Sequence, residues 1–267
     1  MISKLIRQSL KPIKRAAQEK AYKTWLKLFD ELNDENIKLP VQVKAMNIRF
    51  NVHHVGTFLN QFESIFIDEI YRFTTKNDIP VIIDCGSNMG TSVLYFKQLY
   101  PQALIYAFEP DVAIFSILQS NIALNKLSKV EAINKAVYID NQERYFLSSK
   151  TQSGSIVNNE SSTKVTCIRL KDFLSSFNHV DFLKLDIEGA EVEVLNDIKE
   201  LLFKVNHVFV EYHSYLDQPQ SLSTLLAVFE SNGFRYVIGG DQKRQPFTNE
   251  ATDEKMDFTV DIFATKI

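Results

Sequence analysis

The residues Val81-Ile82-Ile83-Asp84-Cys85-Gly86-Ser87-Asn88-Met89-Gly90 carry the strongest structural signal in this sequence. Three β-favouring apolar residues lead to Asp84, while Gly86 and Gly90 let the backbone turn and approach a ligand closely. Apolar residues at helical spacing follow from Val93 onward. The stretch therefore predicts a buried strand, a turn and the start of a helix whose unpaired N–H groups would face an anion, such as a ligand carboxylate.

The spacing of the two glycines indicates which ligand this turn would hold. Asn88 stands where the dinucleotide fingerprint G-x-G-x-x-G has its middle glycine, which disfavours a pyrophosphate. The pattern D-x-G-x-x-x-G suits a ligand with an amino-acid tail, because Asp84 would accept a hydrogen bond from its ammonium group. S-adenosylmethionine is such a ligand, and the alternative is a buried strand and helix cap that bind nothing.

The composition is that of an ordinary globular protein. The chain has 267 residues, enough for one catalytic domain with extensions or at most two small domains. A net charge of −3 gives no general attraction to nucleic acid, so we expect no nucleic-acid partner. Cys85 and Cys167 provide neither a disulfide framework nor zinc spacing. No apolar stretch has the length of a membrane span or a secretory signal, and we expect a cytoplasmic protein.

Residues 1–40 form a basic amphipathic helical extension. Apolar residues recur there at helical spacing, and Pro12 is expected to divide two helices. Lysine and arginine dominate the charged positions. The extension either lies on an anionic membrane surface or on a partner, or it packs on its own domain or on a neighbouring subunit.

Residues 41–267 form the main domain, with an N-terminal cap at 41–78 and an inserted hairpin at 141–170, in which residues 151–156 and 158–163 are polar and turn-prone. The cap begins with alternating apolar residues, which predict a strand pair, and continues with a helical stripe from Phe58 to Phe73. Asn60, Gln61 and Glu63 could face a substrate from this helix, or they could form its exposed side. From residue 80 to about 140, strands and helices alternate, with a helix predicted over 112–124 and a third strand over 130–137. This alternation favours a mainly parallel sheet with helices on both faces.

Glu109 follows the second predicted strand, at residues 103–108. It lies about twenty residues past the glycine turn, where an acid can accept hydrogen bonds from both hydroxyls of a ribose. The alternative is an acidic region at a helix N-terminus, since Asp111 also suits the start of the next helix.

Three further acids follow the apolar run at residues 180–185. Asp186, Glu188 and Glu191 lie at the carboxyl end of a predicted strand, the edge at which ligands bind in open α/β sheets. We expect Asp186 to share the cleft with Asp84, where acids can hold a cationic sulfonium. The alternative, an acidic first helical turn, is our interpretation of Glu191.

His213 follows the next predicted strand, at residues 207–210, and is the histidine best placed for general-base catalysis. The alternative is a structural or substrate-orienting role. Glu188, Glu211 and His213 could gather around an ion, but we predict no metal site.

Several blocks recur in the order typical of one enzyme family: Ile83–Gly90, Ala107-Phe108-Glu109-Pro110, Asn121–Asn125, Lys135-Ala136-Val137 and Lys184-Leu185-Asp186-Ile187-Glu188-Gly189-Ala190-Glu191. Together they resemble the FkbM family of S-adenosylmethionine-dependent methyltransferases over residues 57–240. The resemblance implies a Rossmann-like class I methyltransferase fold of the α/β class, with a seven-stranded, mostly parallel sheet whose last strand is antiparallel. It also implies methyl transfer, usually to a hydroxyl oxygen.

The resemblance also implies roles for individual residues. The methionine end of the cofactor would be held by Asp84, Gly86, Asn88 and Gly90; the ribose by Glu109 with Pro110; and the adenine by Asn134 and Ala136. Asp186 would lie beside the transferring methyl group. Together with the position of His213 after its strand, this leads us to predict Asp186, Glu188 and His213 as the catalytic residues. Ser87 replaces an alanine that is frequent in the family, a change that should not alter the turn.

The expected function is O-methylation of a hydroxyl on a small molecule, sugar or glycan. A nicotinamide-dependent oxidoreductase is an alternative, because an acid after the second strand suits a ribose there too. A non-catalytic module that keeps the nucleotide fold and recruits partners is another, although such a module has no need to gather Asp84, Glu109 and Asp186 at strand ends.

Overall fold

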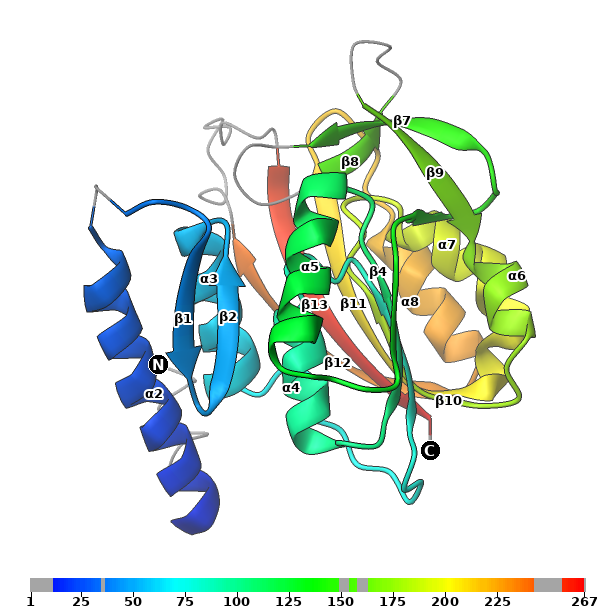
Figure 1. The fold of residues 1–267 in the computed structure, drawn as a ribbon. Coiled ribbons are helices and arrows are strands. Elements are labelled where there is room, and N and C mark those ends of the chain that lie inside the picture. The colour runs from blue at the N-terminus through cyan, green and yellow to red at the C-terminus, as the bar shows by residue number, and fades with distance from the viewer. Residues whose placement is uncertain (1–11, 35–36, 149–153, 158–162, 243–255, 267) are drawn as a thin grey trace.

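The computed structural model describes residues 12–34, 37–148, 154–157, 163–242 and 256–266. Figure 1 shows an α/β domain around one twisted sheet, with a small strand pair and a long helix to one side of it. The α/β class and the Rossmann-like arrangement predicted from the sequence are confirmed.

The central sheet has seven strands in the order β12-β13-β11-β10-β3-β4-β5. Their bounds, in chain order, are β3 Val81–Cys85, β4 Leu104–Phe108, β5 Val130–Ile133, β10 Val180–Leu185, β11 Val205–Tyr215, β12 Phe234–Gln242 and β13 Met256–Lys266. β5, β4, β3, β10 and β11 are parallel, and β13 is antiparallel to both of its neighbours. The predicted mostly parallel sheet with an antiparallel last strand is therefore correct.

Helices cover both faces of the sheet because its strands are apolar on both sides. Ile82 belongs to the core beneath α4 (Thr91–Leu99) and α5 (Val112–Leu124). Its neighbour Ile83 belongs to the opposite core, beneath α6 (Leu170–Ser175), α7 (Glu191–Ile198), the 3₁₀ turn η2 (Lys199–Lys204) and α8 (Leu222–Ser231). Successive side chains of a strand point to opposite faces, so a continuous apolar run indicates a doubly covered strand.

The cap consists of the antiparallel pair β1 (Val41–Ala45) and β2 (Ile48–Val52), the helix α3 (Val55–Phe62) and a π-helical turn η1 (Glu63–Ile67). The predicted strand pair is present. The predicted helical stripe is too long, because helix ends at Ile67 and not near Phe73. The rings of Phe50, Phe58, Phe62 and Phe66 pack with centroids 4.8 to 6.3 Å apart, and this aromatic cluster belongs to the same core as Ile82 of the sheet.

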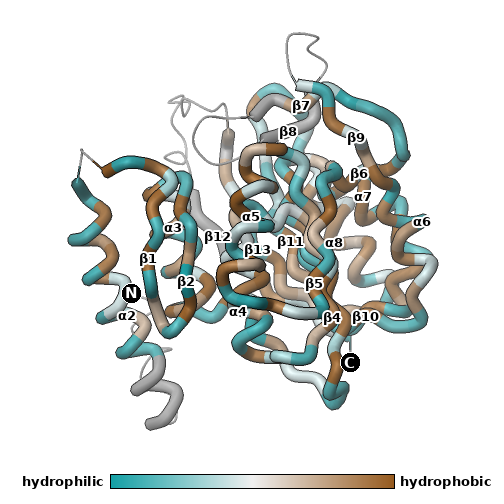
Figure 2. The backbone as a smooth tube through the Cα atoms, viewed as in Figure 1, coloured by the Kyte–Doolittle hydropathy of each residue, from teal (hydrophilic) through white to brown (hydrophobic). Residues whose placement is uncertain are grey.

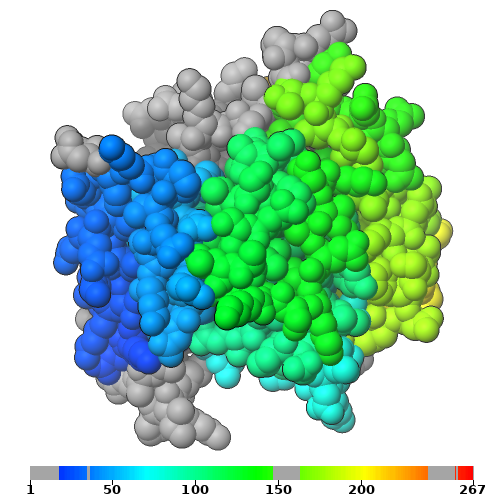
Figure 3. Space-filling model, viewed as in Figure 1, coloured from blue at the N-terminus to red at the C-terminus, as the bar shows by residue number. Residues whose placement is uncertain are grey.

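One long helix, α2 (Pro12–Leu32), packs on the cap. It begins at Pro12, and the helix predicted before Pro12 lies outside the described residues. Ala21, Leu28 and Leu32 are buried, and Trp25 Nε1 donates to the Leu59 carbonyl at 3.0 Å. Figure 3 shows the blue surface of α2 and the β1–β2 pair continuing into the green surface of the main domain.

The outward face of α2 exposes Tyr22, Leu26 and Phe29 beside its lysines, and Figure 2 shows hydrophilic and hydrophobic segments alternating along the helix. Contact of this face with a membrane or another subunit stays a prediction. Among the helices of the described residues, none is both long and apolar enough to cross a membrane.

A second sheet occupies the predicted hairpin region. Its strands are β6 (Ala136–Tyr138), β7 (Glu143–Ser148), β8 (Gly154–Val157) and β9 (Thr163–Arg169), in the order β6-β9-β7-β8. Two details differ from the prediction. The third strand, expected over residues 130–137, divides into β5 and β6, and residues 154–157 form a strand where a polar turn was expected.

β11 is also longer than predicted. β10 ends opposite Val210, but β13 continues to pair with β11 as far as Tyr215. Glu211 and His213 therefore lie within a strand and not in a loop after it.

Candidate active site

The strand register aligns several predicted residues at the carboxyl edge of the sheet. The last paired residues form one row across four parallel strands: Phe108, Cys85, Leu185 and Val210. The residue that follows each of them lines the same cavity: Glu109, Gly86, Asp186 and Glu211. Neighbouring strands thus deliver these groups to one place, although they are far apart in the sequence.

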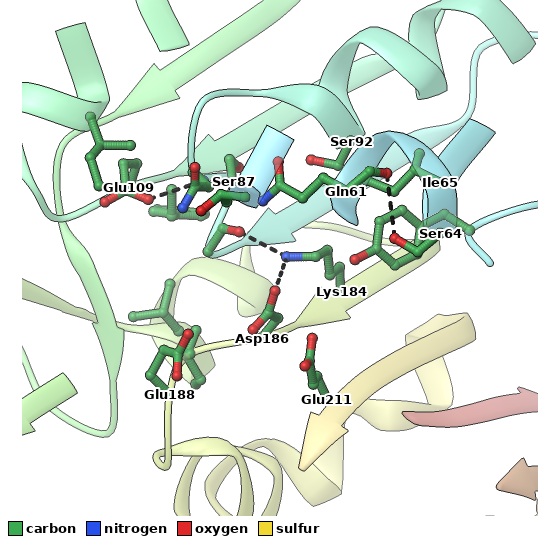
Figure 4. A pocket seen from close by; sticks show the side chains of 18 of the residues that line it. Gln61, Ser64, Ile65, Ser87, Ser92, Glu109, Lys184, Asp186, Glu188 and Glu211 are labelled. Atoms are coloured by element: carbon green, nitrogen blue, oxygen red, sulfur yellow. Dashed lines mark hydrogen bonds and ion pairs between the residues drawn. The ribbon is translucent and has the colours of Figure 1, made fainter. Parts of the chain in front are cut away.

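The cavity has a volume of about 650 Å³. We call its two ends the turn half and the cap half. The turn half is lined by Gly86, Ser87, Asn88, Glu109, Pro110 and Ala136; the cap half is lined by Asn60, Gln61, Glu63 and Ser64. Figure 4 shows Glu109, Ser87, Gln61 and Ser64 along one side of the cavity, Lys184 and Asp186 across from them, and Glu188 and Glu211 beyond Asp186.

The glycine turn brings two strand ends into contact. Gly86 has φ +85°, and a Cβ at this position would lie only 1.8 Å from the Asp186 carbonyl oxygen. Gly90 has φ +87° and begins α4, where a Cβ would lie 2.6 Å from Leu118 Cδ1. Both positions need glycine, but Gly86 lines the cavity whereas Gly90 packs behind it.

Glu109 is held at the cavity wall by backbone groups. Its Oε2 accepts from Asn88 N at 3.0 Å, and its Oε1 accepts from Asp111 N at 2.9 Å. Burial raises the pKa of Glu109 to about 8. The predicted helix cap is Asp111, whose Oδ1 accepts from Ala113 N and Ile114 N, so Glu109 does not serve as the cap.

Asp84 does not occupy the place we predicted. Its side chain is fully buried and lies outside the lining of the cavity. Ser92 Oγ donates to Asp84 Oδ2 at 2.5 Å, and Lys184 Nζ lies 3.4 Å from Oδ1. The expected partner, a ligand ammonium, is thus replaced by an ammonium of the protein itself.

Lys184 is the central residue that the sequence did not reveal. Its Nζ donates to the Gly86 carbonyl at 2.8 Å and to Asp186 Oδ2 at 3.0 Å. Burial alone would lower the pKa of Lys184, but the carboxylates of Asp186 and Asp84 help to raise it well above its usual value. A lysine within an otherwise apolar, doubly covered strand was the available signal, since a buried lysine needs a charged partner.

The two residues predicted at the adenine have different surroundings. Ala136 lines the cavity together with Lys135 and Val137. Asn134 instead donates through Nδ2 to the carbonyls of Glu109 and Pro110, at 2.9 and 3.0 Å. Asn134 therefore positions the backbone of the turn half and lies outside its lining.

His213 is buried behind the acids. Its Nδ1 lies 3.0 Å from Glu191 Oε1, and its Nε2 lies 3.3 Å from Glu188 Oε2. Burial would lower the pKa of His213, but the carboxylates of Glu191, Glu188 and Glu211 raise it well above 6.5. The geometry argues against the predicted general base, because the ring lies outside the cavity lining and both of its nitrogens already face carboxylates.

Glu191 has a larger role than the helix-dipole interpretation gave it. It is buried, its Oε1 accepts from Ile187 N at 3.1 Å, and both carboxylate oxygens accept from Gly189 N. It therefore closes the loop that carries Glu188, which has φ +56°.

Glu188 and Glu211 line the cavity as partly buried acids. Burial raises the pKa of Glu188 to about 7. Burial, together with the nearby Asp186 carboxylate, raises the pKa of Glu211 to about 8. Both groups can therefore exchange a proton near neutral pH.

The cap half contains the three polar residues singled out in the sequence. Asn60, Gln61 and Glu63 all line the cavity, and Gln61 Oε1 accepts from Thr91 Oγ1 at 2.8 Å. Thr259 and Asp261 of β13 line it too. No sequence signal marked these last two, because only the antiparallel pairing of β13 with β11 brings them there.

Comparison with known proteins agrees with the resemblance to the FkbM family. The family model described as "Methyltransferase FkbM domain" matches residues 84–236. "Methyltransferase 1" of Beauveria bassiana is 29% identical over 203 residues, which cover 66% of this chain and 80% of that protein. "2-O-methyltransferase NoeI" of Sinorhizobium fredii is 28% identical over 166 residues, which cover 54% of this chain and 67% of that protein. Among solved structures, M. jannaschii TYW2 in complex with AdoMet has a TM-score of 0.47 and 14% identity, over 86% of this chain and 89% of that one.

The turn half fits the cofactor that this relationship implies. The missing Cβ of Gly86 leaves the strand ends in close contact, and the Glu109 carboxylate is fixed at the cavity wall by two backbone N–H groups. A fixed acceptor in this position suits ribose hydroxyls. The chain belongs to the FkbM methyltransferase domain family.

Proposed function

We propose that this protein transfers a methyl group from S-adenosylmethionine to a hydroxyl oxygen of a hydroxyl-rich acceptor, namely a sugar or glycan. The supporting observation is the polar cap half, which faces the turn half across a single cavity. Amide and carboxylate side chains match the paired donor and acceptor character of sugar hydroxyls. The name of the relative NoeI, a 2-O-methyltransferase, agrees with oxygen as the acceptor atom.

The turn half is assigned to the methyl donor. Gly86 and Asn88 hold its methionine end, Glu109 accepts hydrogen bonds from its ribose, and Ala136 lies at its adenine. When bound, the donor supplies an electrophilic methyl group on a positively charged sulfur. Asp186, midway along the cavity, then provides a carboxylate near that charge.

Alignment is the larger contribution to the rate. Positioning two reactants can lower a barrier by roughly 7 to 11 kcal/mol. The cap half, whose elements α3 and η1 pack against α4, sets the position of the acceptor. Proton removal adds a smaller factor, typically about a hundredfold to ten-thousandfold.

Glu211 is the proposed proton acceptor. It lines the cavity, and its pKa of about 8 means that its ionised form, which accepts the proton, is the minor form at pH 7 and predominates above pH 8. The acceptor oxygen gives its proton to Glu211 and takes the methyl group, while the electron pair of the broken carbon–sulfur bond stays on sulfur. His213 cannot take this part, because it is buried and lies outside the cavity lining.

Methyl transfer from labelled S-adenosylmethionine to a panel of neutral sugars, phenols and amines tests the proposal. We expect methyl ethers of sugars as the main products, identified by NMR. Methylation of nitrogen or carbon, with sugars unreactive, would contradict it.

Two variants separate chemistry from binding. Glu211→Gln should lower kcat about a hundredfold and leave the affinity for S-adenosylhomocysteine within about twofold. Glu230→Gln is the control, because Glu230 accepts from Tyr236 on the surface, away from the cavity. A Glu211→Gln variant with full kcat would remove Glu211 from the reaction.

Family membership speaks against the two alternative functions. A nicotinamide-dependent oxidoreductase is not expected in a methyltransferase family, and a binding module would leave the labelled donor unused. A thermal shift with S-adenosylhomocysteine but not with NAD supports the proposed function.

A further inference from the structure

We propose that Asp186, Glu188 and His213 form a binding site for a divalent cation at the wall of the cavity, where the buried His213 lies behind the two acids. Each residue offers one ligand atom, and these atoms all lie within 4.8 Å of one another. Ligands on opposite sides of an ion, at bond lengths of roughly 2.0 to 2.3 Å, are about 4.0 to 4.6 Å apart. Small side-chain movements would therefore close the three groups around an ion. We call them the cation triad.

The orientation of His213 is the first supporting observation. Glu191, which is only 1% exposed, lies 3.0 Å from Nδ1 through its Oε1. A histidine that binds a metal through one ring nitrogen usually donates its other N–H to a carboxylate. Glu191 also accepts backbone N–H groups of the loop that carries Glu188, so one buried acid fixes two members of the triad.

The surroundings of His213 Nε2 are the second observation. The His213 side chain is 4% exposed, and Nε2 faces Glu188 Oε2 at 3.3 Å and Glu211 Oε1 at 3.9 Å. Ionised carboxylates only accept hydrogen bonds. If Nδ1–H donates to Glu191, a neutral His213 has a lone pair on Nε2. That lone pair would repel the lone pairs of the carboxylate oxygens unless a cation lies between them. A proton on Nε2 is one such cation, and a metal ion is the other.

The charge balance points the same way. Four carboxyl groups gather here: Asp186, Glu188, Glu191 and Glu211. In the described part of the chain, the cationic groups that pair with them are Lys184 and His213. Lys184 is already shared between Asp84 and Asp186. A divalent cation would offset the remaining negative charge.

The position of the triad gives the ion a function, and this part rests on the proposed O-methylation. Asp186 and Glu188 line the cavity, so an ion between them would have open coordination positions toward the acceptor. A bound divalent cation lowers the pKa of a coordinated hydroxyl and orients it. Two carboxylates with one imidazole suit Mn²⁺, while carboxylates alone would favour Mg²⁺ and Ca²⁺.

The test is Mn²⁺ binding to the full chain after chelator treatment, without methyl donor or acceptor. We expect saturable one-site binding by calorimetry, and electron spin echo spectra that show a nitrogen coupled to the bound Mn²⁺. Glu188→Gln and Asp186→Asn should each weaken binding at least tenfold. His213→Gln should abolish the nitrogen coupling, with circular dichroism used to verify folding.

Glu193→Gln is the matched control, since Glu193 lies on the same helix as Glu191 but accepts from Tyr138 outside the triad. It should bind Mn²⁺ within twofold of the unchanged chain. Absence of saturable Mn²⁺ binding, or equal binding by all variants, would overturn the inference. If sugar methylation persists in excess chelator while Mn²⁺ does not bind, the cation triad fails and the proposed function stands. If Mn²⁺ binds through the triad but no sugar is methylated, the proposed function fails and the triad stands.

Discussion

The turn half and the cap half of the cavity are built in different ways. The turn half consists of residues that directly follow parallel strands, so the sheet register alone aligns Gly86, Glu109 and Asp186. The cap half consists of side chains from α3, η1 and β13, which reach the cavity only through tertiary packing. The first is fixed by backbone geometry, and the second depends on how separate elements dock.

This difference explains how proteins of one fold can bind the same methyl donor and yet act on different methyl acceptors. Hydrogen bonds from backbone N–H groups hold Glu109, so its position is insensitive to the side chains around it. The Gln61 side chain is instead held by one hydroxyl, that of Thr91. We therefore expect substitutions in the turn half to affect folding and donor binding, and substitutions in the cap half to affect the acceptor alone.

Gly86→Ala should have the largest effect. An added Cβ would lie 1.8 Å from the Asp186 carbonyl oxygen, and φ is +85°. Left-handed backbone alone costs about 1 to 2 kcal/mol for a residue with a Cβ, and the steric conflict adds to it. We expect loss of S-adenosylhomocysteine binding by calorimetry, together with lower unfolding free energy in urea.

Gly233→Ala is the control for this variant, because Gly233 has φ +74° but a Cβ added there would meet no atom within 4 Å. It should cost only about 1 to 2 kcal/mol of stability and leave donor binding intact. Equal effects of the two variants would show that backbone conformation, and not contact with Asp186, makes Gly86 necessary.

Asp84→Asn should destabilise the fold more than it weakens donor binding. The change removes one partner of the buried Lys184, and breaking a buried ion pair costs roughly 3 kcal/mol. Urea denaturation measures this loss of stability. Calorimetry on the folded variant should give a donor affinity within threefold of that of the unchanged protein. A weakened donor affinity at unchanged stability would instead restore the ligand-binding role predicted from the sequence.

Glu109 predicts a pH dependence of donor binding. Its folded pKa of about 8 lies above the ordinary value of 4.5, so the unliganded protein holds this proton at neutral pH. Ionisation frees both carboxylate oxygens to accept hydrogen bonds from the ribose hydroxyls. The affinity for the methyl donor should therefore rise from pH 6 to pH 8, by at most about tenfold per pH unit. The raised pKa has the opposite effect on folding, because the free energy of unfolding falls as pH rises from 4.5 toward 8.

Calorimetric titrations with S-adenosylhomocysteine at pH 6, 7, 8 and 9 measure this slope. Glu109→Gln should bind at least about tenfold more weakly at pH 9 and show no slope. Glu193→Gln should retain it. A slope that persists in Glu109→Gln would assign the titration to another group.

Gln61→Ala should have the smallest effect, confined to the acceptor. The loss of one neutral hydrogen bond costs about 1 kcal/mol, equivalent to a roughly fivefold higher KM for the sugar. Donor affinity should not change. Gln102→Ala, which removes a surface acceptor of Lys129, is the control. A change in donor affinity in Gln61→Ala would mean that the two halves are not independent.

Sequence patterns predicted the structure best where the local sequence alone determines an element. The bounds predicted for β10 and α5 are those found, since both are set by uninterrupted apolar pattern and, for α5, by the Asp111 cap. Glu109, Gly86 and Asp186 could be placed at one edge because parallel strands end together. Lys184 was overlooked because its partners, Asp84 and Asp186, become visible only when β3 and β10 are adjacent. His213 was misjudged for a similar reason, since its protonation depends on acids brought to it by folding.

The central claim is that Gly86, Glu109 and Asp186 hold the methyl donor with its sulfur directed toward the cap half. A crystal structure of the full chain with S-adenosylhomocysteine tests this most directly. We predict ribose hydroxyls within hydrogen-bonding distance of Glu109 and sulfur on the side of Asp186 that faces Glu211. Density for the nucleoside outside the turn half, or in the reverse orientation with adenine beside Glu211, would contradict the account.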